Sequence, residues 1–595
     1  MTQIADETAR AVAEPGTAAT RRRLVRLGRP TPFGVLAAVV MGALAVLAIV
    51  PLIRVIGGLF VVDGEVTLQP VADTLGAEDL GGLIGSTLAV VVPSSAIALL
   101  LGSALAWLNE RTDARMGFAT DALPLLPFLL PPVAGAVGWV LLLSPRAGLL
   151  NDWIRDVLGL VGITLTEGPF DIHSWYGLIA IYVVYQVPFA FLLVSAGLRS
   201  LDPSLEEQSR MSGAGLARTF RRITLPALAP SMGAAVLLIA WTGLGIYSLP
   251  AIVGTPARIE VLSVRIVRLL TFTFPPETST AVGLSVLVVL VLGTIYWLQA
   301  RILKRGRHAR VGGKGNRARR IELGPWRPVA RAFMLVYVLI AAVLPIVALL
   351  LVSLNGFWTA DIDWGSLSTD AFTQTLIEDR TTRRALTNSL LLGVVGGTVG
   401  IVAAAVVALR VARAKGPVAR LIDSAIKLPA AISHVVVAVG ILLVFSGPPF
   451  DLGGTLALLL LGYLALYMPQ GSVAADAAAG QVGHELSEAS AISGAGRGRT
   501  FRKVELPLMM PGLVAGWAML FIRMVGDLTA SALLAGTRNP VVGFRLLEVF
   551  SNGSYAGLAA LSTALVLITT TVLIGVLTFT RRKARLGIDA KVGGV

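Results

Sequence analysis

The amino-acid sequence predicts an all-α polytopic membrane protein, with about twelve transmembrane helices divided between two homologous six-helix halves. Hydrophobic residues make up 55% of the 595 residues and charged residues only 14%, whereas a soluble domain carries about 25% charged residues. Apolar stretches of about 20 residues, the length that an α-helix needs to cross a bilayer, recur along the whole chain. A polar segment also occurs twice in the same register, which indicates an internal duplication.

The apolar stretches are predicted to be helices because backbone groups in lipid must be bonded within their own segment. The six spans of the first half are predicted at 33–59, 83–108, 119–143, 174–199, 229–253 and 279–301. Those of the second half are predicted at 331–355, 386–409, 421–446, 454–477, 511–535 and 556–580. The chain then divides into an N-terminal tail (1–32), a first membrane domain (33–301), a basic linker (302–330), a second membrane domain (331–580) and a C-terminal tail (581–595).

The distribution of charge predicts the orientation of the chain, because lysine and arginine accumulate in the cytoplasmic loops of membrane proteins. Basic clusters lie in the N-terminal tail, in the linker and at 581–585, whereas the loops on the opposite side carry acidic residues such as Asp63, Glu65 and Asp361. Both termini are therefore predicted to be cytoplasmic. The net charge of +15 has the same explanation, and we expect no nucleic-acid partner.

The residue content also excludes several kinds of site. The chain has no cysteine, which excludes disulfides, thiolate metal sites and cysteine nucleophiles. Its four histidines are scattered without the spacing of metal ligands, so we expect no fixed metal site. The linker sequence VGGKGNR lacks the spacing of a phosphate-binding loop. We therefore expect no cofactor in this chain, and ATP hydrolysis would have to come from another polypeptide.

The duplication extends beyond the repeated segment. Gly138 recurs as Gly440 at an offset of 302 positions, whereas Pro188 recurs as Pro469 at an offset of 281, so the first half contains 21 additional residues between Gly138 and Pro188. Apolar residues at 150, 153, 154, 157 and 158 form one helical face there, which predicts a short helix on the outer membrane surface; a loop without a function is the alternative. The even number of spans in each half predicts a pseudo-twofold axis along the membrane normal. Glycine-rich patches such as 393–400 are assigned only to close helix packing.

The repeated segment reads EQSRMSGAGLARTFRRITLPALAP from Glu207 to Pro230 and EASAISGAGRGRTFRKVELPLMMP from Glu488 to Pro511. Each copy predicts two short helices joined by a glycine bend, followed by a proline at the start of the next span. A cytoplasmic connector requires only basic residues and does not require this order twice, so we predict that both copies dock a partner protein. The candidate docking residues are Glu207, Gly213, Ala214, Arg218, Phe220 and Pro226 in the first copy, and Glu488, Gly494, Ala495, Arg499, Phe501 and Pro507 in the second.

Both copies resemble the EAA loop of permease subunits in binding-protein-dependent ATP-binding cassette importers. The pattern of that family is E-A-A, three residues, G, about nine residues, an apolar residue, one further residue and L-P. Gln208 and Ser209 in the first copy and Ser490 in the second replace alanines of the pattern. The resemblance covers residues 33–580, and the fusion of two domains, together with the segment LTASALLAGTRNPVVGFRLLEVFSNGSYAGLAALS, is most similar to the ferric-iron-type subfamily.

This resemblance implies a transport permease and not an enzyme. Each loop would couple to one of two separate ATPase subunits, which would hold ATP and Mg, while an external binding protein would deliver a small solute. The location implied is the bacterial plasma (inner) membrane, in contact with membrane lipid. Ferric iron is the favoured cargo, and thiamine, phosphonates and sulfate-like oxyanions are the alternatives.

Three ionisable residues inside predicted spans are candidates for the translocation path. A carboxylate in the bilayer is costly, so Asp527 should face protein or water. Arg523 lies four residues earlier on the same predicted helix face, and a structural ion pair between these two residues is the alternative. His434 lies in the predicted ninth span, where a hydrogen-bonded core histidine is the alternative.

Two other classes of protein fit the sequence less well. A secondary transporter of the major facilitator type also has twelve spans in two parallel halves. Its recurring signature would lie between the second and third spans of each half, where WLNERTDARMG and RVARAKGPVAR have little in common. A membrane enzyme is disfavoured because no His, Asp, Glu and Ser constellation converges at the membrane surface, so we expect no catalytic residues.

Overall fold

The computed structural model describes residues 32–62, 64–77, 79–116, 123–305, 320–359, 361–413, 417–480, 488–490 and 492–592. The predicted N-terminal tail up to residue 31, residues 306–319 of the predicted linker and residues 593–595 of the predicted C-terminal tail lie outside the described residues. Within the described residues the chain is helical apart from loops and one hairpin, whose two strands have two residues each. This confirms the predicted all-α membrane fold.

The elements of the first half are α1 (Pro32–Gly57), β1 (Val61–Val62), β2 (Glu65–Val66), α2 (Gln69–Leu75), α3 (Leu80–Arg111), η1 (Leu123–Leu129), α5 (Pro132–Leu143), α6 (Leu149–Leu160), α7 (Trp175–Ser200), α8 (Pro203–Met211), α9 (Leu216–Thr219), η2 (Phe220–Thr224), α10 (Leu225–Gly245), η3 (Pro250–Gly254), α11 (Leu262–Thr271) and α12 (Thr278–Arg305). Elements labelled η are short 3-10 or π-helical segments.

The elements of the second half are η4 (Gly324–Trp326), α13 (Arg327–Val338), η5 (Leu339–Val343), α14 (Leu344–Asn355), α15 (Asp370–Phe372), η6 (Thr373–Glu378), α16 (Arg380–Arg413), α17 (Pro417–Lys427), η7 (Leu428–Ala431), α18 (His434–Phe445), α19 (Leu456–Gly480), α21 (Arg497–Thr500), η8 (Phe501–Glu505), α22 (Leu506–Val525), α23 (Ser531–Leu534), α24 (Val542–Ser551) and α25 (Tyr555–Val592).

Ten helical segments among the described residues are long and apolar enough to cross a membrane, and they correspond to ten of the twelve predicted spans. The predicted third and ninth spans are not continuous helices. Each contains a 3-10 turn, η1 or η7, followed by a short apolar helix, α5 or α18. Pro131 and Pro132 lie at the first break and Pro429 lies in η7. Proline lacks the N–H that a continuous helix requires, which favours a break at these points.

The predicted fifth and eleventh spans begin and end earlier than expected. They run from Leu216 to Gly245 and from Gly498 to Val525, instead of over 229–253 and 511–535. The second short helix of each repeated loop continues through a π-helical turn, η2 or η8, directly into α10 or α22. The loops are therefore joined to the spans without a flexible connection.

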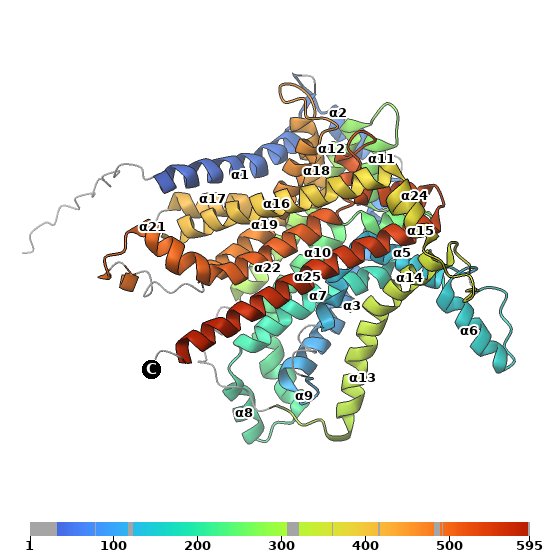
Figure 1. Cartoon of the computed structure of the whole chain (residues 1–595), viewed down its shortest axis with the longest axis horizontal. Coiled ribbons are helices and arrows are strands. Elements are labelled where there is room, and N and C mark those ends of the chain that lie inside the picture. The colour runs from blue at the N-terminus through green and yellow to red at the C-terminus, as the bar shows by residue number, and fades with distance from the viewer. Residues whose placement is uncertain are drawn as a thin grey trace, which may run out of the picture.

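The first span of each half packs against the interrupted third span of the other half. α1 lies along α17 and α18, and α14 lies against α5 (Figure 1). Gly440 of α18 touches Pro51 of α1, and Gly138 of α5 touches Pro345 of α14; a Cβ added to either glycine would lie 2.7–2.8 Å from the proline oxygen. These equivalent contacts agree with the predicted pseudo-twofold relationship and tie the two halves together.

Glycines permit close packing within the second half, as the sequence predicts. α16 packs against α19 and α22. An added Cβ on Gly393 would lie 2.5 Å from the side chain of Val525, and one on Gly396 would lie 2.7 Å from the sulfur of Met524. Small residues allow helices to approach closely inside a membrane, where apolar surfaces have little other reason to associate.

The additional segment of the first half forms the short helix that the sequence predicts. This helix, α6, projects from the main helical body (Figure 1). Its base is held by Asn151, whose Nδ2 donates to the carbonyl oxygen of Phe170 over 2.6 Å. Trp153 and Val157 on its apolar face are 63% and 42% exposed. The structure confirms the helix, and its position on the outer membrane surface stays a prediction.

Candidate functional site: two repeated loops and a central cavity

The first repeated loop is a short helix that ends at a glycine bend. Asp202 caps α8, because its carboxylate accepts the N–H of Ser204 over 2.9 Å. Gly213 ends the turn with φ at +81°, a conformation that costs other residues strain. The N–H of Ala214 donates to the carbonyl oxygen of Ser209 over 3.1 Å. The chain then re-enters helix at α9.

The second loop repeats this geometry 281 positions later. Gly494 has φ at +79°, and the N–H of Ala495 donates to the carbonyl oxygen of Ser490 over 3.1 Å. The Ser490 hydroxyl lies 2.8 Å from that of Thr500, and the equivalent hydroxyls of the first loop, those of Ser209 and Thr219, lie 3.0 Å apart. The serines that replace an alanine of the family pattern therefore close each bend. The sequence contained the signal, since the serine and the threonine recur together in both copies.

Most of the predicted docking residues are accessible. The exposed ones are Glu207, Gly213, Arg218, Phe220, Pro226, Glu488, Gly494, Arg499 and Pro507, and the partly buried ones are Ala214, Ala495 and Phe501. At the end of the first loop, the ring of Phe220 packs edge-on against the ring of Trp107 in α3, with 6.4 Å between their centroids.

An exposed apolar residue lies beside each glycine bend, which the sequence reasoning missed. Met211 is 82% exposed and Ile492, at the equivalent position of the second loop, is 88% exposed. Large apolar side chains that recur at one position of a polar loop indicate a contact surface. The signal in the sequence is an apolar residue two positions before the glycine in both copies.

A buried arginine joins the first loop to the membrane helices. Arg111 lies at the end of α3, and its Nη2 donates to the carbonyl oxygen of Leu198 in α7 over 3.1 Å. Its Nε lies 3.4 Å from Oε2 of Glu206 in α8. Glu206 also accepts the hydroxyl of Thr224 over 2.7 Å. Directed contacts therefore connect α8 to α3, to α7 and to the helical segment that begins at α9.

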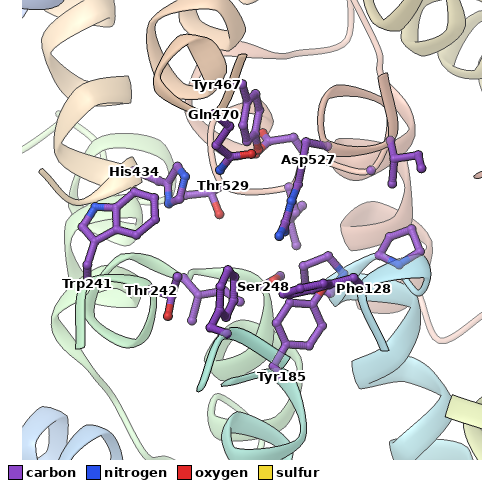
Figure 2. Close-up of a pocket in the computed structure, with 18 residues that line it drawn as sticks. Phe128, Tyr185, Trp241, Thr242, Ser248, His434, Tyr467, Gln470, Asp527 and Thr529 are labelled. Carbon is purple, nitrogen blue, oxygen red and sulfur yellow. The ribbon is translucent and has the colours of Figure 1, made fainter. Parts of the chain in front are cut away.

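A small cavity lies between the two halves and has a volume of about 70 Å³. Figure 2 shows the labelled side chains of the second half on one side of the cavity and those of the first half on the other. Lining residues also form equivalent pairs across the duplication, as Thr242 does with Arg523 and Ser248 with Thr529. The cavity therefore lies at the pseudo-twofold axis, where the transport path of a two-domain transporter is expected.

The three residues predicted to line the path, Asp527, Arg523 and His434, all line this cavity. The direct salt bridge of the alternative interpretation, between Arg523 and Asp527, is not found among the described residues, although both side chains line the same cavity. α22 ends at Val525, so Asp527 no longer lies on the helix face of Arg523. Asp527 instead accepts the hydroxyl of Tyr467 over 2.6 Å and the N–H groups of Ala530 and Ser531 over 2.8 and 3.1 Å.

His434 is not the hydrogen-bonded core histidine of the alternative prediction. Its ring lies 4.8 Å from that of Trp241 and 6.0 Å from that of Tyr467, measured between centroids. Its Nε2 is buried and has no hydrogen-bond partner in the described part of the chain. Trp241 itself bridges the halves, because its Nε1 donates to the carbonyl oxygen of Ile432 over 2.7 Å.

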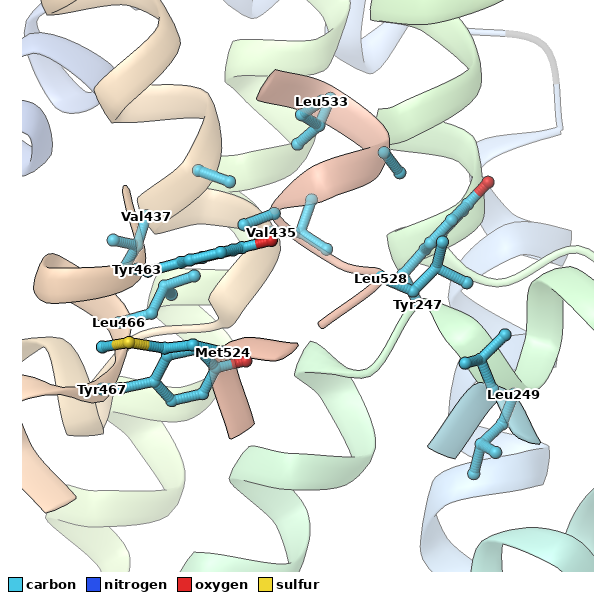
Figure 3. Packing of buried hydrophobic residues seen from close by; sticks show 14 of the residues in the cluster. Tyr247, Leu249, Val435, Val437, Tyr463, Leu466, Tyr467, Met524, Leu528 and Leu533 are labelled. Carbon is cyan, nitrogen blue, oxygen red and sulfur yellow. The ribbon is translucent and has the colours of Figure 1, made fainter. Parts of the chain in front are cut away.

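Buried apolar residues adjoin the cavity. Figure 3 shows Met524 beside Tyr467, with Tyr463 and Leu528 in the same cluster. The rings of Tyr463 and Tyr467 are 6.3 Å apart between centroids. Among the described residues, no group of three His, Asp or Glu side chains is placed to hold a metal ion.

Repeated spanning helices, two loops of matching geometry and a small cavity between the halves define a two-domain helical transport protein. The chain belongs to the family described as binding-protein-dependent transport system inner membrane component, which matches residues 98–308 and 396–585. It is therefore a fused two-domain permease of the ATP-binding cassette importer class, and a multi-pass protein of the inner membrane.

Several characterised permeases are similar to this chain. A ferric-iron transport permease of Haemophilus influenzae is 23% identical over 510 residues, which cover 84% of this chain and 91% of that protein. A sulfate transport permease of Salmonella typhimurium is 31% identical over 212 residues, 35% of this chain and 72% of that protein. A solved bacterial transporter involved in alginate import is 19% identical and covers 46% of this chain and 95% of its own, with a TM-score of 0.37.

Proposed function

We propose that this permease carries a solute into the cell under the control of two separate ATPase subunits, one seated on each repeated loop. The observation that supports this proposal is the recurrence of the same bend, hydroxyl contact and exposed apolar residue at an offset of 281 positions. A loop that served only to connect two spans would not require this geometry twice. ATP and Mg would be held by the partner subunits.

The loops would act by transmitting the closure of the ATPase subunits to the membrane helices. α9 continues into α10, and α21 into α22, and both spans contribute residues to the central cavity. A displacement of either loop would therefore move cavity-lining residues directly. The two halves would rock about the pseudo-twofold axis, opening the path outward to receive cargo and inward to release it.

The partner on the opposite side would be an external binding protein. In Figure 1, α8, α9 and α21 lie toward one end of the helices, and α2, α11 and α24 lie toward the other. The first end carries the basic loops and would be cytoplasmic with both chain termini. The other end would receive the loaded binding protein.

Ferric iron is the cargo that we favour. The relatives named as ferric-iron permeases are similar over most of this chain, whereas the sulfate permease matches about a third of it. Thiamine, a phosphonate or another oxyanion is the alternative. Binding of ferric iron, thiamine, a phosphonate and sulfate to the cognate external binding protein, measured by calorimetry, decides among them.

The coupling proposal is tested in liposomes that contain the permease with its cognate ATPase subunits. Gly213→Leu and Gly494→Leu should abolish the stimulation of ATP hydrolysis by loaded binding protein, because leucine is strained at these positive φ values. Gly162→Leu is the matched control, since Gly162 has φ at +83° and open space around it after α6, away from both loops. Normal uptake by both loop variants would exclude the coupling role.

A further inference from the structure

The central cavity contains an arginine, Arg523, that forms no salt bridge in the described part of the chain, although Asp527 lines the same cavity. The guanidinium carbon of Arg523 lies 5.5 Å from the ring centroid of Phe128 and 5.9 Å from that of Phe189. Aromatic faces attract a cation but do not satisfy its N–H groups. No hydrogen bond from Arg523 is found among the described residues, so its donors remain available to a group inside the cavity.

Asp527 cannot serve a cargo in the same way. Its Oδ2 accepts the Tyr467 hydroxyl, and its Oδ1 accepts the two backbone N–H groups of Ala530 and Ser531. These bonds hold the carboxylate against the turn that leads into α23. Asp527 is 6% exposed, so a cation would have to displace these bonds in order to bind it.

Two further polar atoms that face the cavity lack partners. Nε2 of His434 and Oε1 of Gln470 are buried without a hydrogen bond in the described structure, and both residues line the cavity. Buried polar atoms without a partner are rare because each loses its bond to water. Figure 2 shows both side chains on the same side of the cavity as Asp527. Nε2 of His434, when it carries a proton, would donate to an anion in the cavity, whereas Oε1 of Gln470 is an acceptor and would require an O–H donor such as water.

We propose that this cavity binds a small oxyanion during transport, with the guanidinium of Arg523 as its counter-ion. Arginine presents paired N–H donors that match the oxygens of carboxylate, phosphate or sulfate groups. The hydroxyls of Ser248 and Thr529 line the same cavity and can donate further bonds, whereas that of Thr242 already donates within α10. A bare metal cation would find no open carboxylate among the lining residues, because Asp527 is occupied.

This proposal rests on the proposed function and specifies the chemistry of its cargo. The oxyanion would pass either free or as a ligand of ferric iron. The first half has Thr242 at the position equivalent to Arg523 and Ile246 at the position equivalent to Asp527. The anion would therefore lie closer to the second half, and the duplication has produced a path with charge on one side only.

The test measures binding to the full-length permease in lipid nanodiscs by isothermal titration calorimetry. The probes are inorganic phosphate, sulfate, ferric citrate and, as a hard cation, lanthanum chloride, each titrated separately. We expect Arg523→Gln to weaken anion binding at least tenfold, and Arg523→Lys, which keeps the charge but loses the paired donors, to weaken it less. Arg146→Gln is the matched control, because Arg146 is exposed on the loop before α6 and pairs with Glu167.

The probes distinguish the two sources of the anion. Binding of phosphate or sulfate alone supports a free oxyanion, and binding of ferric citrate alone supports an oxyanion that accompanies iron, provided that Arg523→Gln weakens it. Equal binding by wild type and Arg523→Gln, or no anion binding up to about 1 mM, overturns the proposal. Lanthanum binding that Asp527→Asn abolishes also overturns it. ATPase subunits are absent from this assay, so a failure of loop coupling leaves its result unchanged.

Discussion

Gly440 in α18 lies directly against Pro51 in α1, so the first helix of the chain is held by the second half of the molecule. The equivalent contact joins Gly138 to Pro345. Because both contacts cross between the halves, they resist separation of the two domains. They also mean that neither domain completes its own packing.

The first prediction concerns this contact. Gly440→Val should lower the stability of the permease by about 1–3 kcal/mol, the usual cost of overpacking, because its Cβ would lie 2.8 Å from Pro51. The measurement is the melting temperature in detergent. Gly42→Val in α1 is the control, since a Cβ there meets nothing within 4 Å. Equal melting temperatures for the two variants would contradict the close contact between Gly440 and Pro51.

The second prediction concerns the exposed apolar residues of the loops. Met211→Asp and Ile492→Asp should each weaken binding of an ATPase subunit by roughly tenfold or more, because burying such a side chain contributes about 1.5–3 kcal/mol. The affinity of purified ATPase subunits for the permease in nanodiscs is the measurement. Val66→Asp in the hairpin, at a residue that is 88% exposed, is the control. Unchanged affinity in both loop variants would show that these residues do not contact the ATPase.

The third prediction concerns the pair formed by Arg111 and Glu206. A double-mutant cycle with Arg111→Met and Glu206→Gln should give an interaction energy of roughly 0.5–3 kcal/mol in thermal unfolding, because both side chains are largely buried. The control is the pair formed by Arg199 of α7 and Glu110, the residue before Arg111 in α3, whose arginine is 56% exposed. That control cycle should give about 0–1 kcal/mol. Additive effects of Arg111→Met and Glu206→Gln would show that this pair does not help to hold α8 against α3.

The fourth prediction concerns acid stability at the end of the molecule opposite the loops. Burial acts to raise the pKa of Asp379, but hydrogen bonds from Thr382, Arg545 and the Thr381 N–H outweigh it and hold this pKa below its usual value. A lowered folded-state pKa stabilises the fold above the unfolded-state value, and this contribution is lost as pH falls through the folded-state value.

Wild-type melting temperature should therefore fall as the pH is lowered below about 4, and Asp379→Asn should fall less over the same range while being less stable at neutral pH. The measurement is the melting temperature between pH 3 and pH 7. Asp361→Asn, at an exposed residue of the same connection between α14 and α16, should follow the wild-type curve. If the melting temperatures of wild type and Asp379→Asn changed in parallel with pH, the lowered pKa of Asp379 would be contradicted.

The sequence alone determined the membrane class, ten of the spans and both loops. The length of a span is set by the thickness of the bilayer, and this constraint applies to each segment separately. A span can therefore be predicted from its own sequence. The loop geometry was also predictable, because Gly213 and Gly494 impose a bend through their own backbone conformation. A feature that depends only on a segment's own residues can be predicted from the sequence of that segment.

The tertiary structure decided what depends on distant neighbours. A spacing of four residues between Arg523 and Asp527 predicted an ion pair only if the helix continued, and it ends at Val525, where Asp527 finds Tyr467 of α19 instead. The packing of α1 against α18 could not be predicted from either segment, because only one glycine and one proline in these sequences reflect it. The cavity is formed by residues from opposite halves, and only packing between the halves brings them together.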